Sequence, residues 1–455
     1  MQTATATPSA GVLGLRTAYR TGTLRPRDVV EAVLARIAER GDDAVWISVA
    51  PAAELRERAA ELETLDPALP LYGVPVAVKD NIDVAGLPTT AACPAFAHTP
   101  AADAGSVRRL REAGAIVVGK TNLDQFATGL NGGRSPYGAP ESVFGRDLIS
   151  GGSSSGSAVA VAAGIVPVAL GTDTAGSGRV PAALNGVVGL KPSRGLVGAS
   201  GVVPACRSLD CVSVFTRDVA DAAAVLRVLA GADPDDPWSR TGTPLPRGLT
   251  LALPEGLDFE GDAGMRAAFE AAADGAVARA AGVVRTSVDP LREAGDLLYG
   301  GPWVAERLAV LQDFLAAHPD DVLPVTRAVI EKGSAFSAVD AFRAQYRLQE
   351  LKAWTDRLFT TADLLLLPTV PTTFTRAELA AEPVARNLVL GRYTQSTNLL
   401  DLAALAVPAG TTADGRPCGV TLVGPAFSED RLLAAAAALL PPLVPAPVPS
   451  TPEVP

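Results

Sequence analysis

Two segments rich in glycine and serine enclose an apolar run in the middle of the chain. Residues 150–157 read SGGSSSGS, residues 171–181 read GTDTAGSGRVP, and the run between them contains AVAVAAGIVPVAL. A flexible linker would continue with polar residues, whereas this run belongs in a hydrophobic core. Glycine lets the backbone approach a ligand closely, and free N–H groups in such turns bind anions. The pattern therefore predicts a buried element flanked by two loops that form a functional site.

Short apolar segments alternate with helical ones along the chain. VPVAVK (74–79) and AIVVGK (115–120) are typical of buried strands, and GSVRRLREAG (105–114) between them fits a connecting helix. Further strands are expected at DLLLLPTV (363–370) and GVTLVGP (419–425). This alternation predicts the α/β class, with helices packed on a mixed and largely buried sheet.

The chain is expected to form one domain with a short tail. Its predicted parts are a helical arm over 1–65, a core over 70–230, a mostly helical region over the site at 240–360, the end of the domain at 440, and a proline-rich mobile tail over 441–455. Within the core, Thr216 is the expected N-cap of a helix that Gly231 ends.

Charge and residue counts exclude several classes of function. Lys+Arg total 39 against Asp+Glu 49, so the chain lacks the basic footprint of a protein that binds nucleic acid or an anionic membrane. The first residues do not resemble a signal peptide and no apolar stretch would span a bilayer, which predicts a cytoplasmic protein. Four cysteines without C-x-x-C spacing and two histidines predict neither a metal site nor a cofactor. The catalytic base must then be another residue type.

The motifs resemble the amidase signature family, in which a lysine at a strand end precedes a GGSS loop and a GTD-x-x-GS-x-R-x-P loop. Lys79 ends GVPVAVKDN, Ser153 is the first serine after the glycine pair, and Ser177 stands in GTDTAGSGRVP. The resemblance implies the α/β/α sandwich of that family, with Ser177 as nucleophile, Ser153 as bridging serine and Lys79 as base. The N–H groups of Thr174, Ala175, Gly176 and Ser177 would form the oxyanion hole. Several motifs in the same order make this match specific.

Other segments are similar to the allophanate hydrolases within the family. These are KTNLDQFATGLNGGRSPYG (120–138), the triple serine of GGSSSGSAVAVA and YGGPWVAER (299–307). The resemblance implies that Tyr299 and Arg307 bind the carboxylate of a small carboxylated urea, allophanate, with Gly129 also in the substrate site. Eight residues apart on one helical segment, Tyr299 and Arg307 would lie within about 80° of each other. The alternatives are a hydrolase of biuret-type amides and the A-type chain of an amidotransferase, which would need partner chains and a tRNA.

Two features depart from the allophanate hydrolase pattern. Gly133 stands where a threonine is expected, which would enlarge the pocket or loosen that turn. The expected additional C-terminal domain has no room before residue 455, so a separate protein would handle the first product. The resemblance leaves a homodimer open.

The chemistry requires a lysine that loses its proton near neutral pH. A buried ammonium has a lowered pKa, and strand alternation sends Asp80 to the face opposite Lys79, away from its charge. Ser153 would then pass a proton between Lys79 and Ser177. Asp173, Arg179 and Ser154 are expected to support the loops, the first two as an ion pair.

Two short patterns point elsewhere and are weaker in context. GAIVVGKT (114–121) matches a phosphate-binding loop, but its middle residues form an apolar strand rather than a flexible loop. GSSSG (152–156) matches the nucleophile elbow of α/β-hydrolases, which would make Ser154 the nucleophile and His318 its base. RDLIS is too short for the strand that such an elbow follows, and His318 lies at an expected helix end.

Overall fold

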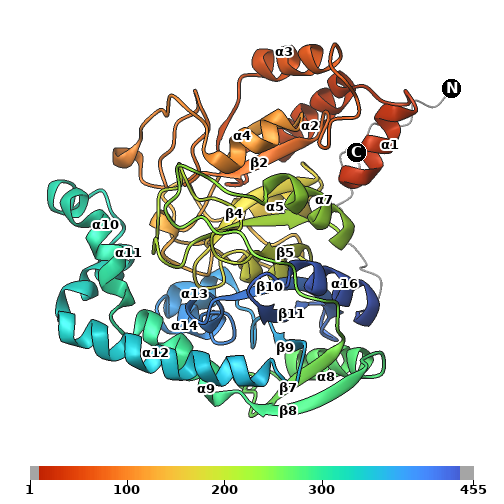
Figure 1. Cartoon of the computed structure of the whole chain (residues 1–455). Coiled ribbons are helices and arrows are strands. Elements are labelled where there is room, and N and C mark those ends of the chain that lie inside the picture. Colours follow the sequence, from red (N-terminus) through yellow and green to blue (C-terminus); the bar gives the residue numbers. More distant parts are fainter. Residues whose placement is uncertain (1–9, 441–455) are drawn as a thin grey trace.

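A mixed sheet of eleven strands forms the centre of the computed structural model, which describes residues 10–440 (Figure 1). The strand order across the sheet is β1-β3-β2-β4-β6-β5-β10-β11-β9-β7-β8. The strands are β1 (Trp46–Val49), β2 (Pro75–Lys79), β3 (Ile116–Thr121), β4 (Val168–Asp173), β5 (Val188–Lys191), β6 (Cys211–Thr216), β7 (Thr250–Glu255), β8 (Gly282–Ser287), β9 (Leu364–Pro368), β10 (Leu402–Thr411) and β11 (Pro417–Pro425). Strand β2 runs parallel to β3 and β4, whereas β4 runs antiparallel to β6. The predicted α/β fold with a mixed sheet is confirmed.

Sixteen α-helices accompany the sheet in the described residues. They are α1 (Gly11–Arg20), α2 (Pro26–Arg40), α3 (Ala52–Leu62), α4 (Gly105–Glu112), α5 (Ser155–Ala162), α6 (Arg179–Leu184), α7 (Val219–Leu229), α8 (Ala263–Val277), α9 (Asp289–Tyr299), α10 (Trp303–Ala317), α11 (Pro324–Glu331), α12 (Ala338–Leu358), α13 (Arg376–Ala381), α14 (Ala385–Leu390), α15 (Ser396–Leu399) and α16 (Glu429–Leu439). Helices α10, α11 and α12 lie together at one side of the molecule (Figure 1).

Alternation along the strands separates two cores, one on each face of the sheet. Val76 and Val78 of β2 join a cluster with residues of α1, α4, α7, α8 and α16, whereas Ala77 joins a second cluster with α5. Every residue of α5 is buried, as expected for the apolar run between the two serine loops. Lys79 follows the same alternation as Ala77, so its side chain points to the α5 side of the sheet.

The structure corrects three local expectations. The arm over residues 1–65 includes a strand, β1, which pairs with β3, and the mostly helical region contains the strand β8. Thr216 does not cap α7, because it ends β6 and pairs there with Val168 and Val188. Asp218 caps the helix instead, where its side chain accepts from the Asp221 N–H at 2.8 Å. The proline-rich segment 441–455 lies outside the described residues.

Candidate active site

Lys79 is buried at the end of β2 and contacts one of the two serine loops. Its Nζ donates to Ser153 Oγ at 2.8 Å and to Thr172 Oγ1 at 2.7 Å. Within residues 10–440 no carboxylate lies within ion-pair distance of Nζ, because Asp80 points away and pairs with Lys120 at 2.9 Å. Burial lowers the pKa of Lys79 to about 7, against the opposing fields of more distant carboxylates led by Asp124. Near neutral pH this amine is therefore able to accept a proton.

Ser153 stands in the loop that leads into α5, and Asp124 holds this loop in place. The Asp124 N–H donates to the Ser153 carbonyl at 3.0 Å. The Asp124 carboxylate accepts from the N–H groups of Asn131, Gly132 and Arg134 at 2.9–3.2 Å. One buried side chain thus joins the Ser153 loop to segment 129–134. The sequence reasoning missed Asp124, although it stands in the same KTNLDQF stretch that carried the family resemblance.

Ser177 lies between β4 and α6 in a turn that a buried ion pair organises. Asp173 and Arg179 are fully buried and form a bidentate contact at 2.9 and 3.0 Å. Burial alone would raise the pKa of Asp173, but the Arg179 guanidinium holds it below its usual value. Ser177 itself is 3 % exposed, and among the described residues no hydrogen bond joins its Oγ to Ser153. The structure therefore closes the first link of the expected relay and leaves the second open.

The Gly176 N–H is not free to serve the oxyanion hole, which corrects the expected set of four donors. It donates to Asp173 Oδ1 at 3.0 Å and so shapes the turn. Gly176 has φ +130°, and a Cβ there would collide with Thr394, so glycine is required at this position. The N–H groups of Thr174, Ala175 and Ser177 remain the candidate donors. Thr394 supports them by donating through Oγ1 to the Ala175 carbonyl at 2.7 Å.

Asp210 is a second carboxylate at this turn that the sequence reasoning did not single out. The Thr174 hydroxyl donates to it, and so do the N–H groups of Ala205 and Cys206, at 2.8 and 3.1 Å. Burial raises the pKa of Asp210 to about 6. Its charge therefore changes within the pH range in which Lys79 also titrates.

Tyr299 and Arg307 meet, but not on one helix as the spacing argument assumed. Tyr299 is the last residue of α9 and Arg307 lies in α10, with a break at Gly300–Pro302 between them. Arg307 Nη2 donates to the Tyr299 hydroxyl at 3.4 Å, and the guanidinium lies 5.3 Å from the centre of the tyrosine ring. Nη1 donates to Thr128 Oγ1 at 3.0 Å.

Arg307 is a buried cation with no carboxylate partner within ion-pair distance among residues 10–440. Burial by itself would lower its pKa, but the surrounding groups, led by Tyr299, raise the pKa and keep the guanidinium charged. The charge of Arg307 also helps to lower the pKa of Lys79, which places the two cations in one electrostatic neighbourhood. A buried charge of this kind favours a bound anion.

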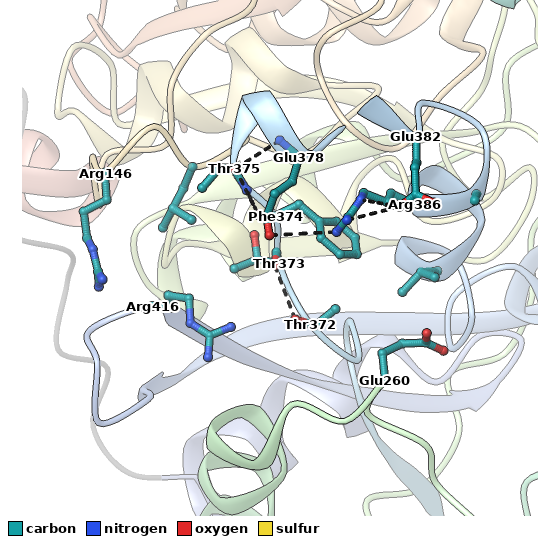
Figure 2. A pocket seen from close by; sticks show the side chains of 13 residues that line it. Arg146, Glu260, Thr372, Thr373, Phe374, Thr375, Glu378, Glu382, Arg386 and Arg416 are labelled. Atoms are coloured by element: carbon teal, nitrogen blue, oxygen red, sulfur yellow. Dashed lines mark hydrogen bonds and ion pairs between the residues drawn. The ribbon is translucent and has the colours of Figure 1, made fainter. Parts of the chain in front are cut away.

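A cavity of about 840 Å³ lies beside Tyr299. Arg134, Gly295, Tyr299 and Gln395 are among the residues that line it, and segment 384–392 forms one wall. A second cavity of about 620 Å³ lies on the other side of α14, where Thr372–Thr375 form one wall (Figure 2). In that second cavity Arg386 pairs with Glu382, and none of the expected site residues lines it.

The remaining expected residues support the loops. Gly129 faces Asp124 so closely that a Cβ would collide with the carboxylate. Gly133 donates its N–H to Asn131 Oδ1 at 2.7 Å and borders a separate cavity of about 350 Å³. Ser154 is fully buried and donates to the Thr172 carbonyl at 3.1 Å.

The two discounted patterns gain no support from the geometry. His318 is exposed at the end of α10 and contacts Asp321 at 3.2 Å rather than Ser154. Residues 116–121 of the phosphate-loop pattern form the strand β3. Among residues 10–440, no helix is long and apolar enough to cross a membrane, and no cluster of His, Cys, Asp and Glu is placed to hold a metal ion.

Comparisons with known proteins agree with this geometry. Residues 28–433 match the Amidase family. The chain is 48% identical over 401 residues to urea amidolyase of Saccharomyces cerevisiae, covering 86% of this chain and 22% of that enzyme. It is 38% identical to the A-type chain of the glutamyl-tRNA(Gln) amidotransferase of Natronomonas pharaonis, covering 83% of this chain and 98% of that one.

A solved structure extends the match to the fold. Allophanate hydrolase of Kluyveromyces lactis superposes with a TM-score of 0.91 at 41% identity, over 97% of this chain and 75% of that one. The chain thus spans about a fifth of the urea amidolyase it matches and three quarters of this allophanate hydrolase. The Lys79–Ser153 contact, the turn around Ser177 and the match over residues 28–433 together show that the chain belongs to the amidase family.

Proposed function

We propose that this protein hydrolyses the terminal amide of allophanate and releases ammonia. The observation that carries the chemistry is a buried lysine with a pKa of about 7 in direct contact with Ser153 Oγ. The substrate follows from the unpaired Arg307 guanidinium beside Tyr299, and from the similarity to proteins named urea amidolyase and allophanate hydrolase.

Proton transfer would begin at Lys79. The neutral amine takes the proton of Ser153 while Ser153 takes that of Ser177, and Ser177 Oγ forms a bond to the amide carbon. The N–H groups that face the developing oxyanion stabilise it, with each donor contributing about 3–4 kcal/mol in measured cases. When the C–N bond breaks, Ser153 returns a proton to the departing ammonia.

Water then completes the reaction. The same relay removes a proton from a water molecule that attacks the acyl-enzyme, and the ester bond to Ser177 breaks. The product carries two carboxylates on one nitrogen and later loses carbon dioxide. A separate protein or domain for this first product is part of the proposal, since the allophanate hydrolase chain extends beyond the matched region.

Arg307 would select the carboxylated substrate. A guanidinium presents a planar fork that matches a carboxylate, and Thr128 and Tyr299 hold two of its nitrogens in place. A biuret-type hydrolase is the second candidate, because its substrate has the same backbone and lacks only the charge. The A-type chain of an amidotransferase is the third, supported by the match to that protein over nearly its whole length.

Ammonia release from allophanate, biuret, urea and malonamate tests the proposal. We expect the highest kcat/KM for allophanate, with no turnover by Ser177→Ala protein in the same assay. Preference for biuret would favour the second candidate. Activity confined to glutamine in the presence of partner chains and a charged tRNA would favour the third.

A further inference from the structure

The side-chain amide of Gln395 borders the 840 Å³ cavity, and no role has been assigned to it. Gln395 is 6 % exposed, and its Nε2 has no hydrogen-bond partner among the described residues. Most buried polar groups in proteins are hydrogen-bonded, so an exception in a cavity wall points to a missing ligand.

The amide has a defined orientation in the cavity wall. Its nitrogen is packed against Gly391, where any Cβ would collide with it. Its oxygen lies toward α9, 3.8 Å from the position that a Cβ on Gly295 would occupy. Gly295 and Tyr299 are four residues apart and share one face of α9. The carbonyl of Gln395 is therefore the end that points toward the Tyr299 side of the cavity.

The backbone on the other side of Gln395 leads to the nucleophile turn. The preceding residue, Thr394, donates to the Ala175 carbonyl at 2.7 Å, two residues before Ser177. On the opposite side, Tyr299 accepts from Arg307. Gln395 thus stands between the group that would attack the amide and the group that would bind the carboxylate.

Allophanate has a matching group at its middle, since a bridging N–H separates the terminal amide from the carboxylate. Building on the proposed function, we infer that Gln395 Oε1 accepts a hydrogen bond from this N–H and selects ureas over analogues with a methylene bridge. A carbonyl oxygen accepts but cannot donate, so it distinguishes N–H from CH₂ directly. A site built to bond an N–H leaves its own polar group unpaired when the analogue lacks it.

Two substrate pairs that differ only at the bridge test this inference. Allophanate and malonamate form the charged pair, and biuret and malonamide form the neutral pair. Gln395→Met keeps a similar volume and removes the acceptor. We expect it to lower kcat/KM for allophanate about three- to tenfold while malonamate stays within about twofold of wild type. Gln345→Met on the exposed face of α12 is the matched control and should change neither value.

Binding measurements separate this inference from the proposed function. Calorimetry with Ser177→Ala protein should show that biuret binds more tightly than malonamide, and that Gln395→Met removes the difference. Gln395→Glu keeps an acceptor at the same position, so the neutral pair should stay distinguished while both anions bind more weakly. Equal losses for both members of each pair in Gln395→Met, or no loss, would overturn the inference. Failure of wild-type protein to hydrolyse allophanate would overturn the proposed function alone, because the neutral pair still reports on Gln395.

Discussion

Thr172 offers a direct test of how Lys79 works as a base. Its Oγ1 accepts from Lys79 Nζ at 2.7 Å, next to the 2.8 Å contact of Nζ with Ser153. A hydroxyl acceptor stabilises the ammonium form of the lysine, so Thr172→Val should destabilise that form and lower the pKa of Lys79 further. The valine has nearly the same shape, which leaves the packing of β4 in place.

The size of the effect follows from the pKa of about 7 for Lys79. With that pKa, about a tenth of the lysine is neutral at pH 6 and about nine-tenths at pH 8, so wild-type kcat/KM should rise about tenfold over this interval. A hydrogen bond to a charged group contributes about 1.5–3 kcal/mol, and one pKa unit corresponds to about 1.4 kcal/mol. Thr172→Val should therefore move the midpoint of the profile about one unit or more toward lower pH.

The assay is the pH dependence of kcat/KM with malonamate, whose carboxylate stays ionised over this range. Asp210 has a pKa raised by burial to about 6 and contributes to the lower part of the profile. Asp210→Asn in both backgrounds removes that contribution. A midpoint that stays near 7 in Thr172→Val, or that rises, would refute the assignment of Lys79 as the base held by this contact.

Three further outcomes are expected. Ser177→Ala should abolish turnover and leave the melting temperature unchanged, since the hydroxyl is small and its loss opens no large cavity; activity near wild type would exclude Ser177 as nucleophile. Arg307→Ala should lower kcat/KM for allophanate about tenfold to a few hundred-fold and hardly affect biuret, with Arg307→Lys in between; equal losses for both substrates would make Arg307 structural. Arg179→Met leaves the Asp173 charge buried without its partner, so urea unfolding should show about 3–5 kcal/mol less stability, and an unchanged midpoint would contradict a structural ion pair.

Local patterns predicted much of the core and the candidate residues. The strands β2 and β3 and the helix α4 between them follow from short apolar runs and helical spacing, which depend on neighbours in the chain. The contact between Lys79 and Ser153 was expected from motif order, and the position of Asp80 on the opposite face from strand alternation. In each case the deciding physics acts over a few residues.

The errors arose where distant segments decide the conformation. WISV forms β1 because β3 offers an edge to pair with, and no local signal marks that partner. Gly176 was expected to donate to the oxyanion, yet its N–H is taken by Asp173, which Arg179 in turn holds charged. Tyr299 and Arg307 meet across a helix break, so their contact depends on how α9 and α10 pack rather than on helical periodicity.

The sequence by itself determined the fold class, the family and the three residues of the expected relay, because the motifs and the strand pattern are encoded in short contiguous stretches. Only the tertiary structure decided which groups surround them. The pKa of Lys79 depends on its burial and on the absence of a carboxylate partner within residues 10–440, and both depend on where β4, α5 and α10 lie. The positions of Thr172, Asp210 and Gln395 around the site likewise arise from segments that are far apart in the chain. Electrostatics and hydrogen bonding act through space, so their outcome is set only when the sheet and its helices have packed.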